Sequence, residues 1–142
     1  MKILALDPGD KRVGLALSDV THTLARPLDF LPANPFANLV KELKKLIGPE
    51  EIGLILVGVP RNMDGSYGEA AIKAREFIEH LKLAIPLPIK GVDERLSTVQ
   101  ASRLLQESGH NTRAQKGKID STAAAVILQS YLDTLQVSDP NL

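Results

Sequence analysis

Residues Met1–Asp19, MKILALDPGDKRVGLALSD, constrain the fold more than any other stretch. Ile3–Leu6 is an unbroken apolar run, which is typical of a strand covered on both faces. Pro8–Gly9 suits the central positions of a type II turn, and Val13–Leu17 alternates at period two. We therefore predict an antiparallel hairpin with Asp7 at the end of its buried first strand. Because Asp often starts turns, this stretch alone favours a turn role for Asp7 over metal binding.

The composition is that of a globular protein without cysteine. The 142 residues suit one domain, and 44% hydrophobic residues can form a real core. Without cysteine there are no disulfides, thiolate metal sites or cysteine nucleophiles, which fits a reducing cytoplasm. The first apolar run is too short for a signal peptide or membrane span. We predict a cytoplasmic protein without membrane contact, in which residues 1–135 form the domain and 136–142 a frayed tail.

The next elements follow from apolar spacing and turn residues. Residues 21–31, with an internal proline, predict a strand at the sheet edge. A helix is expected after Asn34, its natural N-cap, and Pro35, and Gly48–Pro49 ends it. Residues 52–59, IGLILVGV, predict a fully buried central strand.

The second half is predicted to contain three helices and a short strand. Ser66–Glu69 has the pattern of a capping box, and so has Ser97–Gln100. Residues 86–93 form the strand between the two helices that these boxes open. The expected buried face of the first of these helices consists of Ala70, Ala74, Phe77, Ile78 and Leu81. The expected buried face of the last helix consists of Ile119, Ala123, Val126, Ile127 and Tyr131.

The order of elements predicts an α/β fold with one mixed sheet. Three antiparallel strands, followed by two that are reached through helical crossovers, give five strands with helices on both faces. The most economical strand order is 3-2-1-4-5, with the first strand antiparallel to the second and parallel to the last two. Ligands gather at the carboxyl ends of parallel strands in such sheets. Asp7, Pro60–Gly68 and Asp93–Glu94 are expected at that edge.

Four segments resemble, in order, those of the YqgF-type family of pre-16S rRNA nucleases, earlier described as Holliday junction resolvases. They are DPGDKRVGLALSD, GVPRNMDGSYG, DERLST and KIDSTAAAVILQSYL, and the resemblance extends from Met1 to about Tyr131. It implies a ribonuclease H-like fold, a cytoplasmic location and a metal-dependent nuclease that acts on structured or precursor nucleic acid. The acidic positions of the family carry over to Asp7, Glu94 and Asp120. Unlike better-known resolvases of this fold, the fourth strand ends without an acid, so the second carboxylate would come from the fifth strand.

Elementary geometry permits a metal site at these positions. Strand spacing of about 4.8 Å places the ends of the first and fifth strands about 10 Å apart. Two magnesium ions about 4 Å apart, each about 2 Å from carboxylate oxygens, span a comparable gap. The expected cofactor is therefore Mg²⁺ or Mn²⁺. Without the resemblance, Asp120 would be interpreted as a helix N-cap, and Asp93 is an even choice between ligand and solvated residue.

The remaining polar candidates have simpler explanations. Asp64 could cap its loop or assist metal binding, and the cap is favoured. His110, in a polar segment, is expected to lie on the surface. His22 and His80 offer still less to a catalytic site.

The 17 basic residues balance 17 acidic ones, so the net charge gives no support to nucleic-acid binding. Any such binding must rest on where individual basic residues lie. The free amides of Gly65, Ser66, Tyr67 and Gly68, which open a predicted helix, could together with the helix dipole receive a phosphate. The expected contact residues are Lys11, Arg12, Arg61, Gly65, Ser66, Arg95, Lys116 and Lys118. Loops on protein surfaces are commonly charged. For any single basic residue, an ordinary solvent-exposed position is therefore nearly as good an explanation as phosphate contact. Tyr67 is the one aromatic residue expected to be exposed for base stacking.

Precursor rRNA, cut during 5'-end maturation of 16S rRNA, is ranked above branched DNA as the substrate. Resolving a four-way junction calls for two sites on a twofold axis, and such a dimer needs an apolar self-complementary patch. The assigned apolar positions are already needed for the core, so we expect a monomer that forms a weak dimer at most.

Two other classes of function stay open. A nucleotide-binding enzyme related to actin-like ATPases and sugar kinases needs a second domain, for which 142 residues leave no room. A non-catalytic nucleic-acid-binding module is the other alternative, and metal-dependent cleavage would exclude it.

Overall fold

The computed structural model describes residues 1–60, 66–94 and 121–137. The elements in these ranges are β1 (Lys2–Pro8), β2 (Arg12–Ser18), β3 (Ala25–Pro32), α1 (Phe36–Ile47), β4 (Ile52–Val59), α2 (Glu69–Ala84), β5 (Ile89–Asp93) and α4 (Thr122–Val137). The predicted capping box Ser97–Gln100 lies outside the described residues. No helix within them combines the length and the apolar character that crossing a membrane requires.

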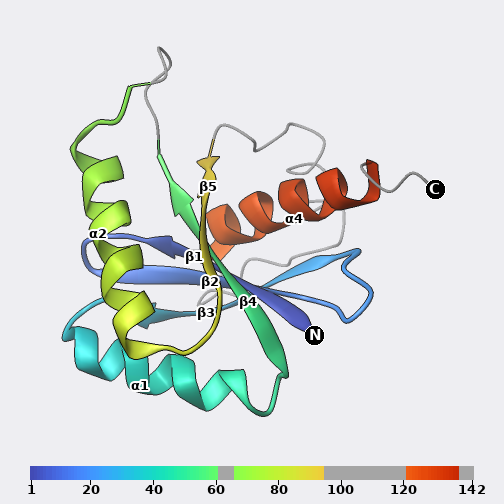
Figure 1. Ribbon diagram of the computed structural model, residues 1–142, viewed down its shortest axis with the longest axis horizontal. Coiled ribbons are helices and arrows are strands. Elements are labelled where there is room, and N and C mark those ends of the chain that lie inside the picture. Colours follow the sequence, from blue (N-terminus) through green and yellow to red (C-terminus); the bar gives the residue numbers. More distant parts are fainter. Residues whose placement is uncertain (61–65, 95–120, 138–142) are drawn as a thin grey trace, which may run out of the picture.

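The strands form one mixed sheet in the order β3-β2-β1-β4-β5, which confirms the predicted order (Figure 1). β1 pairs antiparallel with β2 and parallel with β4. β2 pairs antiparallel with β3, and β4 parallel with β5. The carboxyl ends of β1, β4 and β5 therefore meet at one edge of the sheet.

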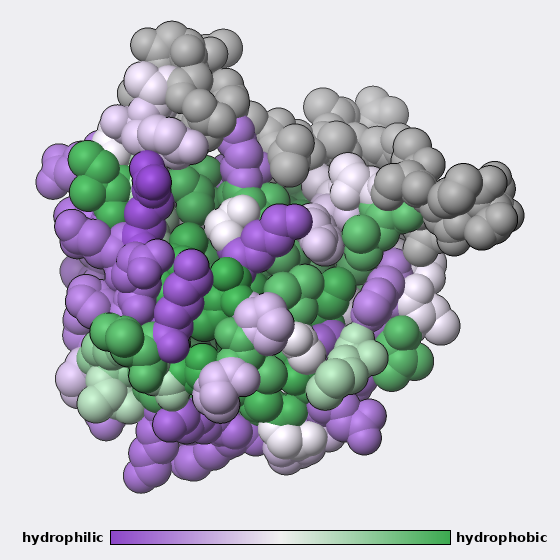
Figure 2. Space-filling view, viewed as in Figure 1, coloured by the Kyte–Doolittle hydropathy of each residue, from purple (hydrophilic) through white to green (hydrophobic). Residues whose placement is uncertain are grey.

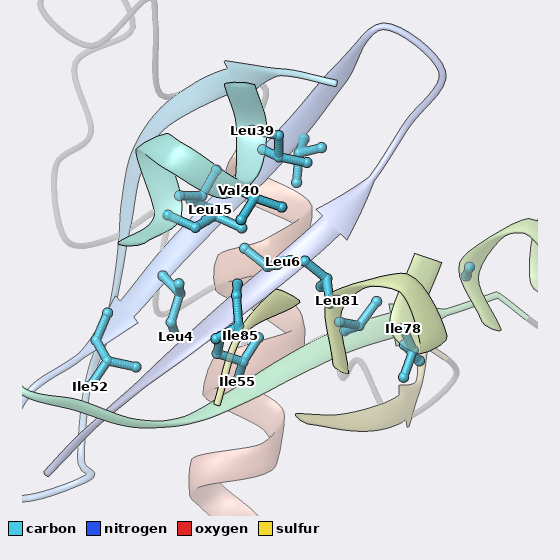
Figure 3. Packing of buried hydrophobic residues seen from close by; sticks show 14 of the residues in the cluster. Leu4, Leu6, Leu15, Leu39, Val40, Ile52, Ile55, Ile78, Leu81 and Ile85 are labelled. Carbon is cyan, nitrogen blue, oxygen red and sulfur yellow. The ribbon is translucent and has the colours of Figure 1, made fainter. Parts of the chain in front are cut away.

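Helices cover both faces of the sheet, as predicted (Figure 1). Alternation along β1 sends Leu4 and Leu6 into the cluster beneath α1 and α2, which Figure 3 shows from close by. Ile3 and Ala5 point the other way, into the cluster beneath α4. In the view of Figure 2, hydrophilic residues cover the outer sides of α1 and α2, and hydrophobic residues lie between them. The two clusters make the sheet the middle layer of three.

The turn between β1 and β2 differs from the predicted one. β1 continues through Pro8, which pairs with Val13. The Gly9 amide donates to the Arg12 carbonyl oxygen at 2.9 Å, so the chain turns around residues 10 and 11. The prediction of a type II turn centred on Pro8–Gly9 is therefore wrong. Gly9 is needed for a close approach, since a Cβ there would lie 2.8 Å from the Arg12 oxygen.

Two predicted helix caps are also wrong. α1 starts at Phe36 with Pro35 as its N-cap, and the Asn34 side-chain amide instead donates to the Asp10 carbonyl oxygen at 3.0 Å. α2 starts at Glu69 with Gly68 as its N-cap, so Glu69 cannot occupy the third helical position that a capping box requires. The Asn34 side chain is already hydrogen-bonded to Asp10, and Ser66 lies two residues before the actual N-cap of α2.

The buried faces of two helices are displaced by one residue at their start. In α2, Ala71 is buried and Ala70 is exposed, although Ala74, Ile78 and Leu81 are buried as predicted. In α4, Ala123 is exposed, and the buried apolar residues are Ala124, Ala125, Ile127, Leu128 and Leu132. Val126 and Tyr131 are only half-buried, and Ile119 lies outside the described residues. α4 ends at Val137 and so includes the first two residues of the expected tail.

Buried polar side chains fix α4 to the sheet. Ser121, which is fully buried just before the helix, accepts a hydrogen bond from the Leu15 amide at 2.9 Å. This amide lies where the β2–β3 ladder shifts register. About two turns along the helix, Gln129 accepts from the Ala25 amide and donates to the Thr23 carbonyl oxygen, both at 2.9 Å. These bonds set the position of α4 along β2 and β3.

Replacing Ser121 should therefore cost stability. In Ser121→Ala the Leu15 amide stays buried and loses its acceptor, so the free energy of unfolding should fall by about 1–3 kcal/mol in urea denaturation. Thr122→Ala, one residue along and exposed, is the control and should change it by less than about 0.5 kcal/mol. Equal effects of the two substitutions would contradict the role given to Ser121.

Candidate active site

Asp7 lies on the α4 face of the sheet, at the carboxyl end of β1. Ile3 and Ala5 of the same strand belong to the α4-facing cluster, and alternation puts Asp7 on their side. The residue is half-buried and pairs across the ladder with Gly14 of β2. Asp7 is a strand residue whose backbone is fixed by sheet pairing, and the turn begins only after it.

Glu94 follows β5 directly and lies on the same face. Val92, two residues earlier, belongs to the α4-facing cluster. A Cβ built on Gly58 of β4 would lie 3.0 Å from Glu94 Oε1 and 2.8 Å from Ile127 Cδ1 of α4. Glu94 and α4 thus cover the same point of the sheet, and the Glu94 side chain extends over β4.

The Asp7 and Glu94 carboxyl groups are hydrogen-bonded to each other. A bond between two carboxyl groups requires that one of them carry a proton, and Glu94 is the donor, because the bond raises the pKa of Glu94 and lowers that of Asp7. The two strands that bear them are separated by β4. The structure thus brings together two of the three acidic residues that the sequence singled out.

The environment raises the pKa of both groups. Burial, the negative charge of Asp7, the hydrogen bond with Asp7 and the charge of Asp93 together raise the pKa of Glu94 from an ordinary 4.5 to about 7. Burial also raises the pKa of Asp7, while the hydrogen bond from Glu94 opposes the change. At neutral pH Glu94 is therefore protonated in about half of the molecules, whereas a carboxyl group with an ordinary pKa would be ionised. Carboxyl groups perturbed in this way are typical of functional sites.

A family model described as RuvX, Holliday junction resolvase, matches residues 1–134. The chain belongs to the RuvX family. This agrees with the resemblance to YqgF-type proteins found in the sequence. A relative from Thermoanaerobacter pseudethanolicus, named "Putative pre-16S rRNA nuclease", is 42% identical over 135 residues, covering 94% of this chain and 97% of its own. A relative from Halothermothrix orenii with the same name is 42% identical over 133 residues, covering 94% and 95%.

Solved structures show the same fold at low sequence identity. RuvC of T. thermophilus in complex with Holliday junction substrate matches with a TM-score of 0.68 and 13% identity, over 97% of both chains. The Fowlpox virus resolvase in complex with Holliday junction DNA matches with a TM-score of 0.55 and 12% identity, over 95% of this chain and 99% of that one. The predicted ribonuclease H-like fold of this RuvX-family chain is confirmed.

Asp93 lies on the opposite face of the sheet from the Asp7–Glu94 pair. It alternates with Val92 on β5 and lines a pocket of about 390 Å³ on the α2 face, together with Tyr67 and Arg75. The Arg75 guanidinium lies 5.0 Å from the centre of the Tyr67 ring. Of the two choices that the sequence left for Asp93, this placement favours a role outside the carboxylate pair.

The histidines of the described residues lie away from the pair, as expected. His22 Nε2 contacts the Met1 carbonyl oxygen at 2.6 Å, near the amino end of β1. The His80 ring packs edge-on against Phe36, with ring centres 5.9 Å apart. His110 and Asp64 lie outside the described residues.

Part of the expected nucleic-acid surface is described. Lys11 and Arg12 are exposed in the hairpin that follows Asp7, at the same edge of the sheet. The Arg12 guanidinium lies 5.0 Å from the centre of the Phe30 ring. Ser66 is exposed before α2. The other candidates, Arg61, Gly65, Arg95, Lys116, Lys118 and Asp120, lie outside the described residues.

Two residues of the site were not singled out from the sequence. Gly58 provides the bare stretch of β4 beneath Glu94, and Ser121 anchors the start of α4 beside β2. For Gly58 the sequence did offer a signal. A glycine near the end of an apolar, β-branched strand often marks a place where another group approaches the backbone closely. A buried serine at a helix start gave no comparable signal.

The donor set fits a hard divalent cation. Carboxylate oxygens are the ligands that Mg²⁺ prefers, and it keeps several waters, so two protein carboxylates can begin a site. Within the described residues no group of three or more histidine, cysteine or acidic side chains could hold a metal ion. A further protein ligand would thus come from another part of the chain.

The carboxylate pair predicts how stability depends on pH in metal-free protein. The folded state holds the Glu94 proton up to a pKa of about 7, whereas the unfolded state releases it near 4.5. Its contribution to stability is therefore complete at low pH and is lost as the pH rises through this window. Urea denaturation with a chelator should show wild type losing stability relative to Glu94→Gln between about pH 5 and about pH 8.

Glu76→Gln, on the exposed side of α2, is the control for this comparison. It should differ from wild type by a constant amount over the same pH range. A constant difference for Glu94→Gln as well would show that Glu94 titrates normally in the folded protein.

Proposed function

We propose that this RuvX-family chain is a metal-dependent nuclease that hydrolyses phosphodiester bonds, with Asp7, Glu94 and Asp120 as its acidic residues. The observation that carries the proposal is the hydrogen-bonded Asp7–Glu94 pair at the carboxyl edge of the parallel strands. Two half-buried carboxyl groups in contact repel each other when ionised, and a divalent cation relieves that repulsion. Family membership supports the same reaction.

Asp120 is proposed as the third acid on the strength of its neighbour. Ser121 is bonded to the Leu15 amide, and Leu15 pairs with Leu6, the residue before Asp7. Consecutive Cα atoms are only about 3.8 Å apart, so this anchor supports a contribution from Asp120 to the site. Asp120 itself lies outside the described residues, and the family resemblance is the other support for its role.

The residues of the chain have distinct tasks in this reaction. Asp7 and Glu94 would hold Mg²⁺ or Mn²⁺, and Glu94 would be deprotonated in the cation-bound state. Such a cation would lower the pKa of an attacking water and stabilise the leaving oxygen of a phosphodiester. Lys11 and Arg12, beside the pair, are proposed to bind phosphates of the substrate, with Arg61, Gly65, Ser66, Arg95, Lys116 and Lys118.

Precursor 16S rRNA is the proposed substrate, cut at its 5' end during ribosome biogenesis in the cytoplasm. Two relatives that are 42% identical over 94% of this chain are named "Putative pre-16S rRNA nuclease". Four-way DNA is the second candidate, because the family description names Holliday junctions. A single carboxylate site in one chain suits one cut at a time, which favours RNA processing by a monomer.

The acidic residues should be essential for cleavage. Asp7→Asn, Glu94→Gln and Asp120→Asn should each lower Mg²⁺-dependent cleavage of precursor rRNA by more than about 100-fold, since even residues that only support metal ligands cost 10–100-fold. Their free energies of unfolding should equal or exceed that of wild type, because a repelling charge is removed. Asp29→Asn, exposed on β3, should retain activity. Near-normal turnover by any of the three would remove that residue from the set.

If the basic residues contact phosphates, substituting them should make RNA binding less dependent on salt. Arg61→Ala and Lys118→Ala should weaken binding of uncleaved RNA and reduce the slope of log affinity against log salt by about 1 each. Lys44→Ala, in the last turn of α1, is the matched control and should leave the slope unchanged. A slope as steep as that of wild type would argue against a phosphate contact at that position.

The two substrates should be compared directly. Precursor rRNA and four-way DNA can be incubated in parallel with Mg²⁺ or Mn²⁺, while light scattering measures the oligomeric state at the assay concentration. The proposal expects a monomer that cuts the RNA. A stable dimer that makes paired nicks in four-way DNA and spares the RNA would establish the second candidate, and metal-dependent cleavage of neither would support a binding module.

A further inference from the structure

The strand between Asp7 and Glu94 has no side chain where the two carboxyl groups meet. On the α4 face of β4, Leu56 is buried in the cluster beneath α4 and Leu54 packs against it. Alternation makes Gly58 the next position on that face. Gly58 pairs with Val92 of β5, and its neighbour Val57 pairs with Leu6 of β1. It therefore lies between the ends of the two strands that lead to the acidic residues.

The space above Gly58 is occupied by the Glu94 side chain. A Cβ at this position would lie 3.0 Å from Glu94 Oε1 and 3.3 Å from Glu94 Cγ. It would also lie 2.8 Å from Ile127 Cδ1, closer than real Cβ contacts come. Every larger side chain would extend further into the same space. Glu94 thus runs across the bare backbone of β4.

This crossing explains how Asp7 and Glu94 come into contact although β4 separates the strands that lead to them. Strands that flank a third strand lie about 10 Å apart, too far for a hydrogen bond between residues that point straight out of the sheet. Asp7 and Glu94 nonetheless share a hydrogen bond. The contact forms because Glu94 leans over β4 toward β1, and it can do so only where β4 presents no side chain.

We propose that Gly58 is a positioning residue of the active site: its missing side chain lets Glu94 cross β4 and form one cation-binding unit with Asp7. The inference deepens the proposed function, since it rests on the Asp7–Glu94 pair being the catalytic metal site. The competing explanation is that Gly58 only makes room for Ile127 and so serves packing of α4.

Substitutions can separate these two explanations. Gly58→Ala introduces the clash with both Glu94 and Ile127. Gly58→Ala combined with Ile127→Val removes the Cδ1 atom and relieves the packing clash, but keeps the clash with Glu94. Ile127→Val alone measures the cost of the lost methyl group. Gly91→Ala on β5 is the matched control, because its Cβ meets Ile78 and Val59 at 3.2 Å, away from the carboxylate pair.

Two readouts follow the carboxylate pair without requiring catalysis. The first is the affinity for Mn²⁺ alone, measured by calorimetry. The second is the loss of stability of metal-free protein between about pH 5 and about pH 8, measured against Glu94→Gln in the same Gly58 background. The free energy of unfolding of each variant at low pH reports packing separately.

The positioning role predicts that the double variant regains stability at low pH relative to Gly58→Ala. It also predicts that both Gly58 variants bind Mn²⁺ at least about tenfold more weakly than wild type and lose the pH-dependent destabilisation. Gly91→Ala and Ile127→Val should retain both properties. Recovery of Mn²⁺ binding or of the pH dependence in the double variant, or their retention in Gly58→Ala, would overturn the proposal in favour of packing.

These outcomes are distinct from failure of the proposed function. A wild-type protein that cuts neither RNA nor DNA would contradict nuclease activity. The pH comparison would still decide whether Gly58 sets the contact between Asp7 and Glu94.

Discussion

Pairing of β1 on both of its edges is the constraint on which the rest of the structure depends. β2 fixes its register on one side and β4 on the other. The alternation along β1 then separates Leu4 and Leu6, which pack beneath α1 and α2, from Ile3, Ala5 and Asp7 on the α4 face. A slip of one residue would exchange the faces and bury Asp7 beneath α2. The location of the acidic site is thus a consequence of core packing at the opposite end of the same strand.

The carboxylate pair is the point at which stability and function oppose each other. Half-buried, with a raised pKa on both groups, it favours a neutral or cation-bound state over two free charges. A core designed only for stability would replace either group with an apolar residue or a hydrogen-bonded amide. Local conflicts of this kind are expected at functional sites, where the surrounding structure holds them in place. Here the restraint comes from sheet pairing at Asp7 and from α4 packed beside Glu94.

The sequence was sufficient for the topology but not for the contacts of the site. Strand order followed from long-range rules, because the apolar run at 52–59 can only be central and the crossovers around it short. Local caps failed at Asn34 and Ser66, since side-chain competition and the first helical residue are decided by tertiary structure. The buried face of α4 was predicted only in part, with Ile127 right and Ala123 wrong, because TAAAVIL is apolar nearly all round and so gives weak periodicity. The approach of Glu94 to Asp7 depends on the missing side chain of Gly58, which leaves room for Glu94 over β4.

The hydrogen bonds that fix α4 have a consequence for the order of folding. Ser121 and Leu15 are separated by 106 residues, and Gln129 and Ala25 by 104. Contacts of such long range close large loops, which is slow compared with helix or hairpin formation. During synthesis the hairpin that bears Asp7 emerges well before the helix that covers its face. The acidic edge therefore gains its α4 wall only when Thr122–Val137 has left the ribosome, and until then Asp7 lacks the helix that shelters it.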